Sequence, residues 1–188
     1  NLARGENSQA GQIGHIPVVG NSTLCACGQQ GCLNTIASGW AILADLKLSI
    51  PPASSPQRLV EDGVLLEDVI SRAQNGDRGV SIAAHRAGEA LGDMLSGMYR
   101  ALSPEIVMVV GPIAEIDFYI EGIKKSARSN NIELPLMTPA DQKFKSVASS
   151  AALHGLTEFL FSPRLRLAKL LPKEEGFVSP YLQSGGTV

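Results

Sequence analysis

The stretch that decides how this chain is interpreted is residues 11–38, GQIGHIPVVGNSTLCACGQQGCLNTIAS. It holds every cysteine of the sequence together with one histidine: His15, Cys25, Cys27 and Cys32. Three thiolates and one imidazole supply four ligands, the number that a closed tetrahedral zinc site requires. Gly28 and Gly31 can adopt the backbone conformations that a sharp reversal around a small ion needs.

The same cysteines could instead be ordinary buried thiols or belong to disulfides. Three cysteines in 188 residues is an odd and sparse count, whereas small secreted proteins that rely on disulfides are dense in paired cysteines. We therefore predict a reducing, cytoplasmic compartment and a structural Zn²⁺ ion. Because four protein ligands leave no position for water, the metal is expected to hold the loop in shape rather than to activate a nucleophile.

The ligand spacing and its flanks, residues 11–18 and 25–38, resemble the signature of the ROK family, which comprises repressors, open reading frames and sugar kinases. Two further segments, 106–111 and 160–171, are similar to the same family. The resemblance implies an α/β chain that forms the carboxyl-terminal lobe of an actin-like, ribonuclease-H-like ATPase fold, with a zinc-binding loop at 11–38.

The beginning of the chain looks like the middle of something larger. Residues 1–9 are polar, include no initiator methionine and lead directly into the zinc motif, so we interpret the chain as a carboxyl-terminal fragment. We assign residues 1–172 to one lobe for effector binding and oligomerisation. Residues 173–188 are rich in Gly, Ser, Pro and charge, and are expected to form a flexible tail. In the family, the preceding part would carry the phosphate-binding lobe, the catalytic aspartate of the kinases and, in the repressors, a winged helix-turn-helix.

Composition limits the partners of this chain. Charged residues make up 18% and apolar residues 44%, and a net charge of −2 gives no basic footprint for nucleic acid. Contact with DNA is therefore expected only through an amino-terminal domain outside this chain. The apolar runs are short, so no membrane insertion is expected.

Hydrophobic periodicity predicts alternating helices and strands after the loop. We expect helices at 34–48, 64–74, 77–102, 115–128 and 146–161, and strands at 106–110 and 132–136. The strand at 106–110 is apolar on both faces, as in a parallel sheet covered on both sides, and the order of elements indicates a right-handed α/β unit. Gly88 and Gly92 lie one turn apart in the long central helix, which indicates close packing either within the chain or across a dimer.

Three positions bear on sugar chemistry: Gln12, His15 and Asn34. In the family the zinc histidine also faces the sugar, and the residues matching Gln12 and Asn34 are usually glutamates that accept hydrogen bonds from sugar hydroxyls. Here both are amides, which carry no charge and can donate as well as accept. Loss of two negative charges relaxes repulsion of an anion, so we expect a phosphorylated or acidic sugar rather than glucose. The alternative is a pocket that has drifted and binds nothing tightly.

Two functions compete for this chain. One is the effector-binding part of a sugar-responsive repressor that forms a homodimer or homotetramer; the other is part of an ATP-dependent sugar kinase. Kinases of the family tend to have consecutive glycines after the strand matching 106–110, because the nucleotide needs close backbone approach, whereas here Gly111 precedes Pro112, which has no N–H. The segment 160–171 also resembles the end of repressors of the NagC and Mlc type. We favour the regulator, with no catalytic residue in this chain; a zinc-ordered dimerisation module without a small-molecule ligand is a third possibility.

Overall fold

The computed structural model describes residues 10–49 and 56–138, without the side chains of residues 56–60. All described residues belong to one compact unit, Asn1–Lys145. The predicted helix at 146–161, the predicted boundary at residue 172 and the predicted tail at 173–188 lie outside the described residues. Among the described helices, none combines the length and the apolar character that crossing a bilayer requires.

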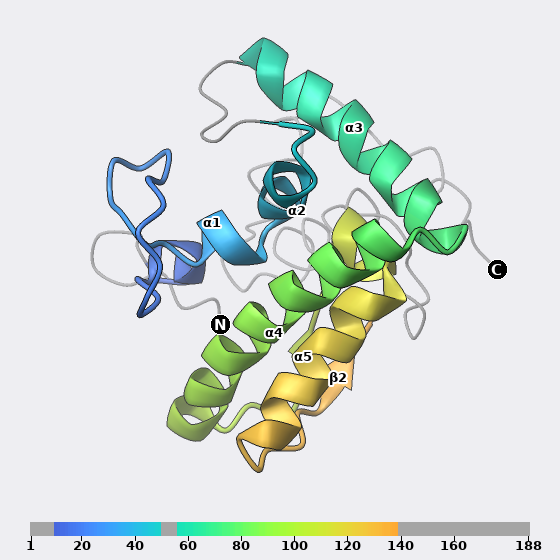
Figure 1. The fold of residues 1–188 in the computed structure, drawn as a ribbon. Coiled ribbons are helices and arrows are strands. Elements are labelled where there is room, and N and C mark those ends of the chain that lie inside the picture. Colours follow the sequence, from blue (N-terminus) through green and yellow to red (C-terminus); the bar gives the residue numbers. More distant parts are fainter. Residues whose placement is uncertain (1–9, 50–55, 139–188) are drawn as a thin grey trace, which may run out of the picture. The chain divides into compact units, whose positions relative to one another are not determined.

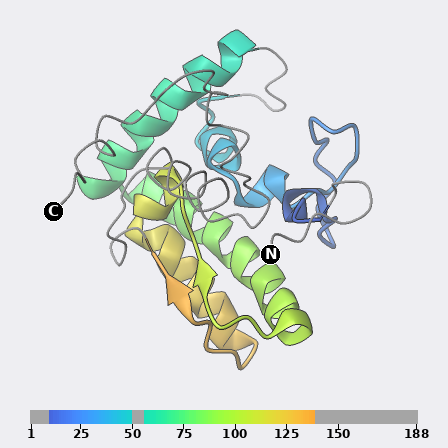
Figure 2. The same cartoon turned by 180° about the vertical axis from the view of Figure 1, so that it is seen from behind.

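The described part of the chain contains helices and a pair of short strands. In chain order they are the 3-10 helix η1 (Ile13–His15), α1 (Asn34–Ala37), α2 (Gly39–Asp45), α3 (Pro56–Gln74), α4 (Arg78–Leu102), β1 (Val107–Met108), the 3-10 helix η2 (Pro112–Glu115), α5 (Asp117–Ser129) and β2 (Leu136–Met137) (Figure 1). The strands pair in parallel, with Val107 opposite Leu136. Because α5 lies between them in the chain, the predicted unit of strand, helix and parallel strand is present. Figure 2 shows the two strands running beside each other on the side of α4 and α5 that faces the viewer.

Two long helices, α4 and α5, pack side by side (Figure 1) and approach so closely that their facing positions must be glycine. A Cβ atom on Gly88 would lie 2.1 Å from the carbonyl oxygen of Tyr119, and one on Gly122 would lie 2.2 Å from that of His85. At Gly92 the nearest atom would be the carbonyl oxygen of Ile123, at 2.6 Å. Gly88 and Gly92 therefore serve packing within the chain, which decides between the two alternatives that the sequence left open.

The hydrophobic core joins these helices to α2, α3 and Val109, the residue directly after β1. Its most deeply buried large side chains include Ile42, Leu43, Val69, Ile116 and Ile123, all with at most 1% of their surface exposed. A hydrogen bond crosses this core: the hydroxyl of Tyr119 on α5 donates to the carbonyl oxygen of Ala37 at 2.9 Å. The end of α1, directly after the cysteine-rich loop, is thereby fixed to a helix 82 residues away in the chain.

The fourth helix begins where the sequence predicts. The carboxylate of Asp77 caps α4 by accepting hydrogen bonds from the backbone N–H groups of Gly79 and Val80, at 2.9 and 3.1 Å. It also accepts two hydrogen bonds from the guanidinium of Arg72, at 2.8 and 2.9 Å. The Arg72 hydrogen bonds, together with the capped N–H groups, hold the pKa of Asp77 below its ordinary value.

The single helix predicted at 34–48 differs from the structure at two points, and the first is an interruption at Ser38. The backbone of Ser38 is extended, and its hydroxyl accepts a hydrogen bond from the N–H of Ala41 at 3.1 Å, so Ser38 caps α2. The apolar pattern continues through the interruption because both helices face the same core. At the other end, α2 stops at Asp45, and Lys47 has a positive φ of 60°.

Other boundaries also differ from the predictions. Helix α3 begins at Pro56 rather than at residue 64, because proline is favoured at the first position of a helix and does not end one there. The strand predicted at 106–110 is shorter, and it is not covered on both sides by described residues. The side chains of Ile106, Met108 and Val110 are 54, 55 and 54% exposed, while Val109, which points the other way, is buried. The helix predicted at 115–128 is confirmed as α5, which starts at Asp117, and the strand predicted at 132–136 pairs only at Leu136–Met137.

Candidate metal centre and adjoining pocket

The cysteine-rich loop is held by a few backbone contacts rather than by regular secondary structure. Two isolated antiparallel bridges, between Pro17 and Cys32 and between Leu24 and Gln30, fold it back on itself. The reversal depends on Gly31, whose φ is 80° and whose Cβ, if present, would lie 2.6 Å from the backbone oxygen of Asn21. Gly28 also has a positive φ, of 87°, as the sequence predicted for a sharp turn.

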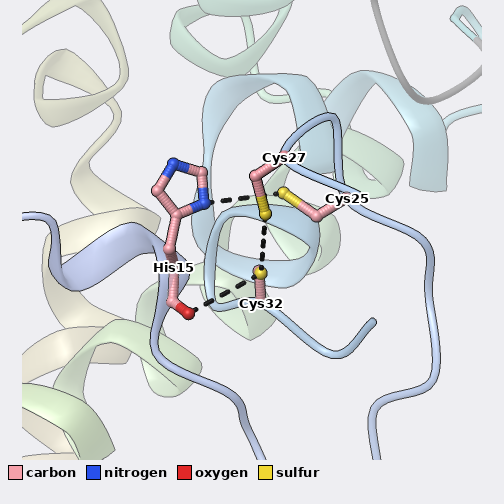
Figure 3. Close-up of side chains that lie close together, drawn as sticks. All are labelled: His15, Cys25, Cys27 and Cys32. Carbon is pink, nitrogen blue, oxygen red and sulfur yellow. Dashed lines mark hydrogen bonds between the residues drawn. The ribbon is translucent and has the colours of Figure 1, made fainter. Parts of the chain in front are cut away.

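This turn brings the four predicted metal ligands together (Figure 3). The nearest ligand atoms of His15, Cys25, Cys27 and Cys32 all lie within 4.8 Å of one another. Nδ1 of His15 is 3.7 Å from Sγ of Cys25, and Sγ of Cys27 is 3.6 Å from Sγ of Cys32. The second ring nitrogen of His15 points away from the three sulfur atoms. Cys25 and Cys32 are buried and Cys27 is exposed.

These distances fit a shared ion and exclude a disulfide. Two sulfur atoms that are each about 2.3 Å from a tetrahedral zinc ion lie about 3.8 Å apart, close to the 3.6 Å between Cys27 and Cys32. A disulfide would bring the same atoms to about 2.05 Å. One imidazole and three thiols form a soft, four-membered donor set that suits Zn²⁺ and leaves no position for water. The cluster could therefore hold a metal ion for a structural purpose.

The protonation of the thiols is uneven. A hydrogen bond from the backbone N–H of Gln29 lowers the pKa of Cys27, whereas burial raises the pKa of Cys32 to about 12. The exposed sulfur of Cys27 thus carries negative charge more readily than the sulfur of Cys32 when no cation is bound. A divalent cation would favour the thiolate form of every cysteine, since metal binding displaces thiol protons.

Two polar residues of the loop, Asn21 and Gln29, support the ligands, and the sequence analysis missed both. The side-chain amide of Asn21 donates to the backbone oxygen of Cys32 at 3.2 Å and to the hydroxyl oxygen of Thr35 at 2.8 Å, and its own oxygen accepts from the N–H of Thr23. The side-chain oxygen of Gln29 lies 4.0 Å from the sulfur atoms of Cys27 and Cys32. Both residues lie inside the motif, but neither is a metal-ligand type, which is why a search for ligands passes over them.

A cavity of about 400 Å³ adjoins the loop and receives two of the three predicted sugar-binding residues. His15 and Asn34 line it from the side of the loop and α1, and α2 and α3 supply the remaining wall. Gln12, the third predicted residue, is exposed immediately before η1 and does not line this cavity. The structure therefore brings His15 and Asn34 together and leaves Gln12 apart from them.

Gly14 fixes where the Asn34 side chain can lie. A Cβ on Gly14 would be 2.3 Å from Oδ1 of Asn34 and 2.7 Å from Nδ2, so the amide occupies the space that any other residue at position 14 would fill. The glycine preceding His15 thus controls the position of a side chain that lines the cavity.

Comparison with known proteins shows to which family the chain belongs. The sequence profile of the ROK family matches residues 1–159. The chain belongs to the ROK family. The N-acetylmannosamine kinase of Yersinia pestis is 31% identical over 122 residues, which make up 65% of this chain and 38% of the kinase, and that of Yersinia pseudotuberculosis matches to the same extent. This ROK chain therefore spans less than two fifths of the length of these curated relatives.

Solved structures of both functional classes share the fold of this ROK chain. A ROK glucokinase from Streptomyces griseus, in complex with glucose and AMPPNP, has a TM-score of 0.56 and 26% identity, covering 71% of this chain and 46% of the glucokinase. A ROK transcriptional regulator homologous to the Escherichia coli Mlc protein has a TM-score of 0.54 and 22% identity, covering 72% of this chain and 36% of the regulator. The chain thus has the mixed helix and strand architecture of the actin-like sugar-kinase fold. This likeness confirms the predicted fold class at that level.

Proposed function

We propose that this ROK chain is the carboxyl-terminal, sugar-effector-binding and oligomerisation part of a transcriptional regulator, and that DNA is bound through an amino-terminal domain outside it. The observation that carries the proposal is the turn after β1. Gly111 has a φ of 105°, and Pro112 is the first residue of η2. Nucleotide phosphates are bound by backbone N–H groups at such positions, and proline has no N–H to offer.

A sugar kinase is the second candidate, and it is supported by the similarity to N-acetylmannosamine kinases and to a glucokinase. The two candidates separate in an assay of the full gene product with ATP and neutral hexoses. A regulator is expected to form no ADP and to change its affinity for DNA when its sugar is added. Sugar-dependent formation of ADP would reverse the assignment.

We propose that His15, Cys25, Cys27 and Cys32 hold a structural Zn²⁺ ion. The ion would supply a cross-link between η1 and the cysteine loop, two segments joined by little regular structure. One equivalent of zinc per chain is expected by elemental analysis, and removal with a strong chelator should lower the thermal midpoint until zinc is restored. Cys27→Ser replaces the exposed ligand and should lower the zinc content with the least change in core packing. A fully stable, metal-free chain would contradict the proposal.

We propose His15 and Asn34 as the sugar contacts from the loop side, because both line the same cavity. Gln12 can contribute only to a ligand that extends out of the cavity to the surface of the loop. The predicted preference for a phosphorylated or acidic sugar rests on the amides of Gln12 and Asn34 alone. Asp62, which the sequence analysis missed, adds a carboxylate to the cavity and opposes that preference.

The proposed oligomerisation is supported only by the resemblance to the ROK family. Gly88 and Gly92 of α4 are covered by α5, so a homodimer or homotetramer would use a surface other than these two positions. Light scattering on the full gene product measures the oligomeric state. Sugar binding separates the regulator from a dimerisation module without a ligand and from a cavity that has lost its ligand. The cytoplasmic location stays a prediction from cysteine content.

A further inference from the structure

We propose that Cys27 is an oxidation site through which a hydroperoxide opens the cysteine cluster, and that Cys32 resolves the oxidised sulfur by forming a disulfide with it. This inference rests on the proposed zinc ion, because it states how that ion would be released under oxidising conditions. The three thiols, which the sequence alone does not distinguish, thereby have different roles.

The three cysteines differ in their access to a dissolved oxidant. The side chain of Cys27 is exposed, whereas Cys25 is 4% exposed and Cys32 has no exposed surface. Cysteine oxidation is selective for thiolates that solvent can reach. A bound divalent cation would hold all three sulfur atoms as thiolates, so exposure decides which of them reacts first. A peroxide molecule in solution would therefore reach Cys27 before the other two.

The backbone holds Cys27 at the tip of a tight turn. The N–H of Gly28 donates to the carbonyl oxygen of Cys25 at 2.9 Å, and the N–H of Cys25 donates to the carbonyl oxygen of Gln29 at 2.8 Å. These two hydrogen bonds close the turn on either side of Cys27. The sulfur that meets the oxidant thus belongs to a surface turn rather than to a helix or strand.

Cys32 is placed to resolve an oxidised Cys27 (Figure 3). The two sulfur atoms are 3.6 Å apart and a disulfide needs about 2.05 Å, so they must approach by about 1.5 Å. Cys32 is anchored by its bridge to Pro17 and by the hydrogen bond from Asn21 to its carbonyl oxygen, so the surface turn is the part that moves. Cys25 is a poorer partner, because a disulfide across one intervening residue closes a small ring that departs from favoured disulfide geometry.

The reaction balances with the peroxide as the oxidant. The thiolate of Cys27 attacks one peroxide oxygen, so that an S–O bond forms, the O–O bond breaks and hydroxide leaves; the product is a sulfenic acid. The thiolate of Cys32 then attacks the sulfur of Cys27, so that the S–S bond forms, the S–O bond breaks and a second hydroxide leaves. The two sulfur atoms together lose two electrons, which reduce hydrogen peroxide to the two hydroxides. A dithiol reductant reverses the change by thiol–disulfide exchange.

The disulfide would undo the proposed metal cross-link. It joins two residues of the cysteine loop and leaves His15 and Cys25 as the remaining ligands, too few for a four-coordinate structural site. His15 and Cys25 also line the cavity of about 400 Å³ beside the loop. Oxidation at the exposed sulfur would therefore release the ion and change one wall of that cavity.

The test uses the zinc-loaded 188-residue chain, treated with a small excess of hydrogen peroxide, with and without dimedone, a reagent that traps sulfenic acids. Without dimedone, a chromogenic chelator should detect one equivalent of zinc for each disulfide formed. Differential alkylation and fragment-ion mass spectrometry should place that disulfide between Cys27 and Cys32. With dimedone, the adduct should form on Cys27 at least about tenfold faster than on Cys25 or Cys32. A dithiol reductant and added zinc should restore the starting state.

Three variants separate the roles, with circular dichroism confirming that each is folded. Cys27→Ser removes the exposed sulfur, so the two remaining thiols should be oxidised at least about tenfold more slowly than Cys27 of the unaltered chain. Cys32→Ala removes the resolving thiol, so Cys27 should accumulate as a sulfenic acid that dimedone traps. Ala26→Ser places a hydroxyl in the same exposed turn without removing a thiol, and should change neither the rate nor the disulfide pairing.

The outcomes distinguish this inference from the zinc proposal. A purified chain without zinc would remove both together. A zinc-loaded chain in which the sulfenic acid forms first on Cys25 or Cys32, or in which the disulfide includes Cys25, would overturn this inference and leave the zinc ion standing. Retention of zinc after the peroxide treatment would do the same.

Discussion

Gly88→Ala should destabilise this protein strongly although it adds one methyl group to a helix. The new Cβ would lie 2.1 Å from the carbonyl oxygen of Tyr119 and 3.0 Å from its carbonyl carbon. Ordinary contact between such atoms needs about 3.5 Å, so α5 would have to move away by about an ångström. Both nearest atoms are backbone, and no side-chain rotation can relieve the overlap.

The size of the effect follows from two opposing terms. Overpacking of this kind typically costs about 1–3 kcal/mol, and more when backbone must shift, whereas alanine improves helix propensity by up to about 1 kcal/mol. Gly97→Ala is the matched control, because Gly97 lies on the same helix with nothing within 4 Å of its Cβ position. Gly97→Ala should therefore show only the gain in stability that comes from the higher helix propensity of alanine.

The two variants should therefore differ by about 3 kcal/mol, or by about 6–12 °C in thermal midpoint for a protein of this size. Thermal and urea unfolding followed by circular dichroism measure the difference. If Gly88→Ala were as stable as Gly97→Ala, the close approach of α4 and α5 would be wrong, and with it the conclusion that these glycines serve packing within the chain.

Three further predictions concern the loop, the core and the start of α4. Tyr119→Phe should cost about 1–2 kcal/mol in urea unfolding, because the carbonyl oxygen of Ala37 loses its buried donor; an unchanged unfolding midpoint would argue against that hydrogen bond. Gly14→Ala should displace the Asn34 amide and weaken sugar binding in calorimetry with little change in thermal midpoint, since only the end of a side chain must move; undiminished affinity would remove Asn34 from the site. The pKa of Asp77 lies below its ordinary value of 3.8, so its ionised form stabilises the fold fully above about pH 4, and this contribution falls as the pH drops toward the folded-state pKa. Asp77→Asn, which keeps a capping oxygen but loses the charge beside Arg72, should flatten the fall of thermal midpoint between pH 5 and pH 3, and an unchanged slope would show that the ion pair contributes nothing.

The clustering of His15 with the three cysteines was predictable from sequence because these residues lie close together in the chain. The three cysteines fall within eight residues, and Gly28 and Gly31 permit the turn that gathers them. The limits of α4 were predictable for a similar reason, since its apolar stripe is long and Asp77 is a strong capping residue. In each case the pattern is local and has one physical interpretation.

Other features depend on contacts that no local pattern encodes. Trp40 and Asp62 meet at one cavity only after α2 and α3 have packed, and each alone resembles an ordinary helical residue. Ser38 separates α1 from α2 by capping α2 with its hydroxyl. The helical spacing of apolar residues continues across this position, so the sequence pattern gives no sign of the interruption. The exposed side of β1 was unpredictable because the apolar residues of a strand do not reveal which of its two faces is covered.

The sparse backbone pairing of the cysteine loop has a consequence for how the protein opens. Two isolated bridges and exposed side chains such as Val19 and Leu24 give this segment few apolar contacts, so its local opening should take much less free energy than global unfolding. Hydrogen exchange at its amides would then report whether the proposed zinc ion is bound, while the amides of α4 and α5 exchange on a slower, separate timescale. Loss of the proposed zinc ion would therefore loosen the cysteine loop first and leave the helical scaffold intact.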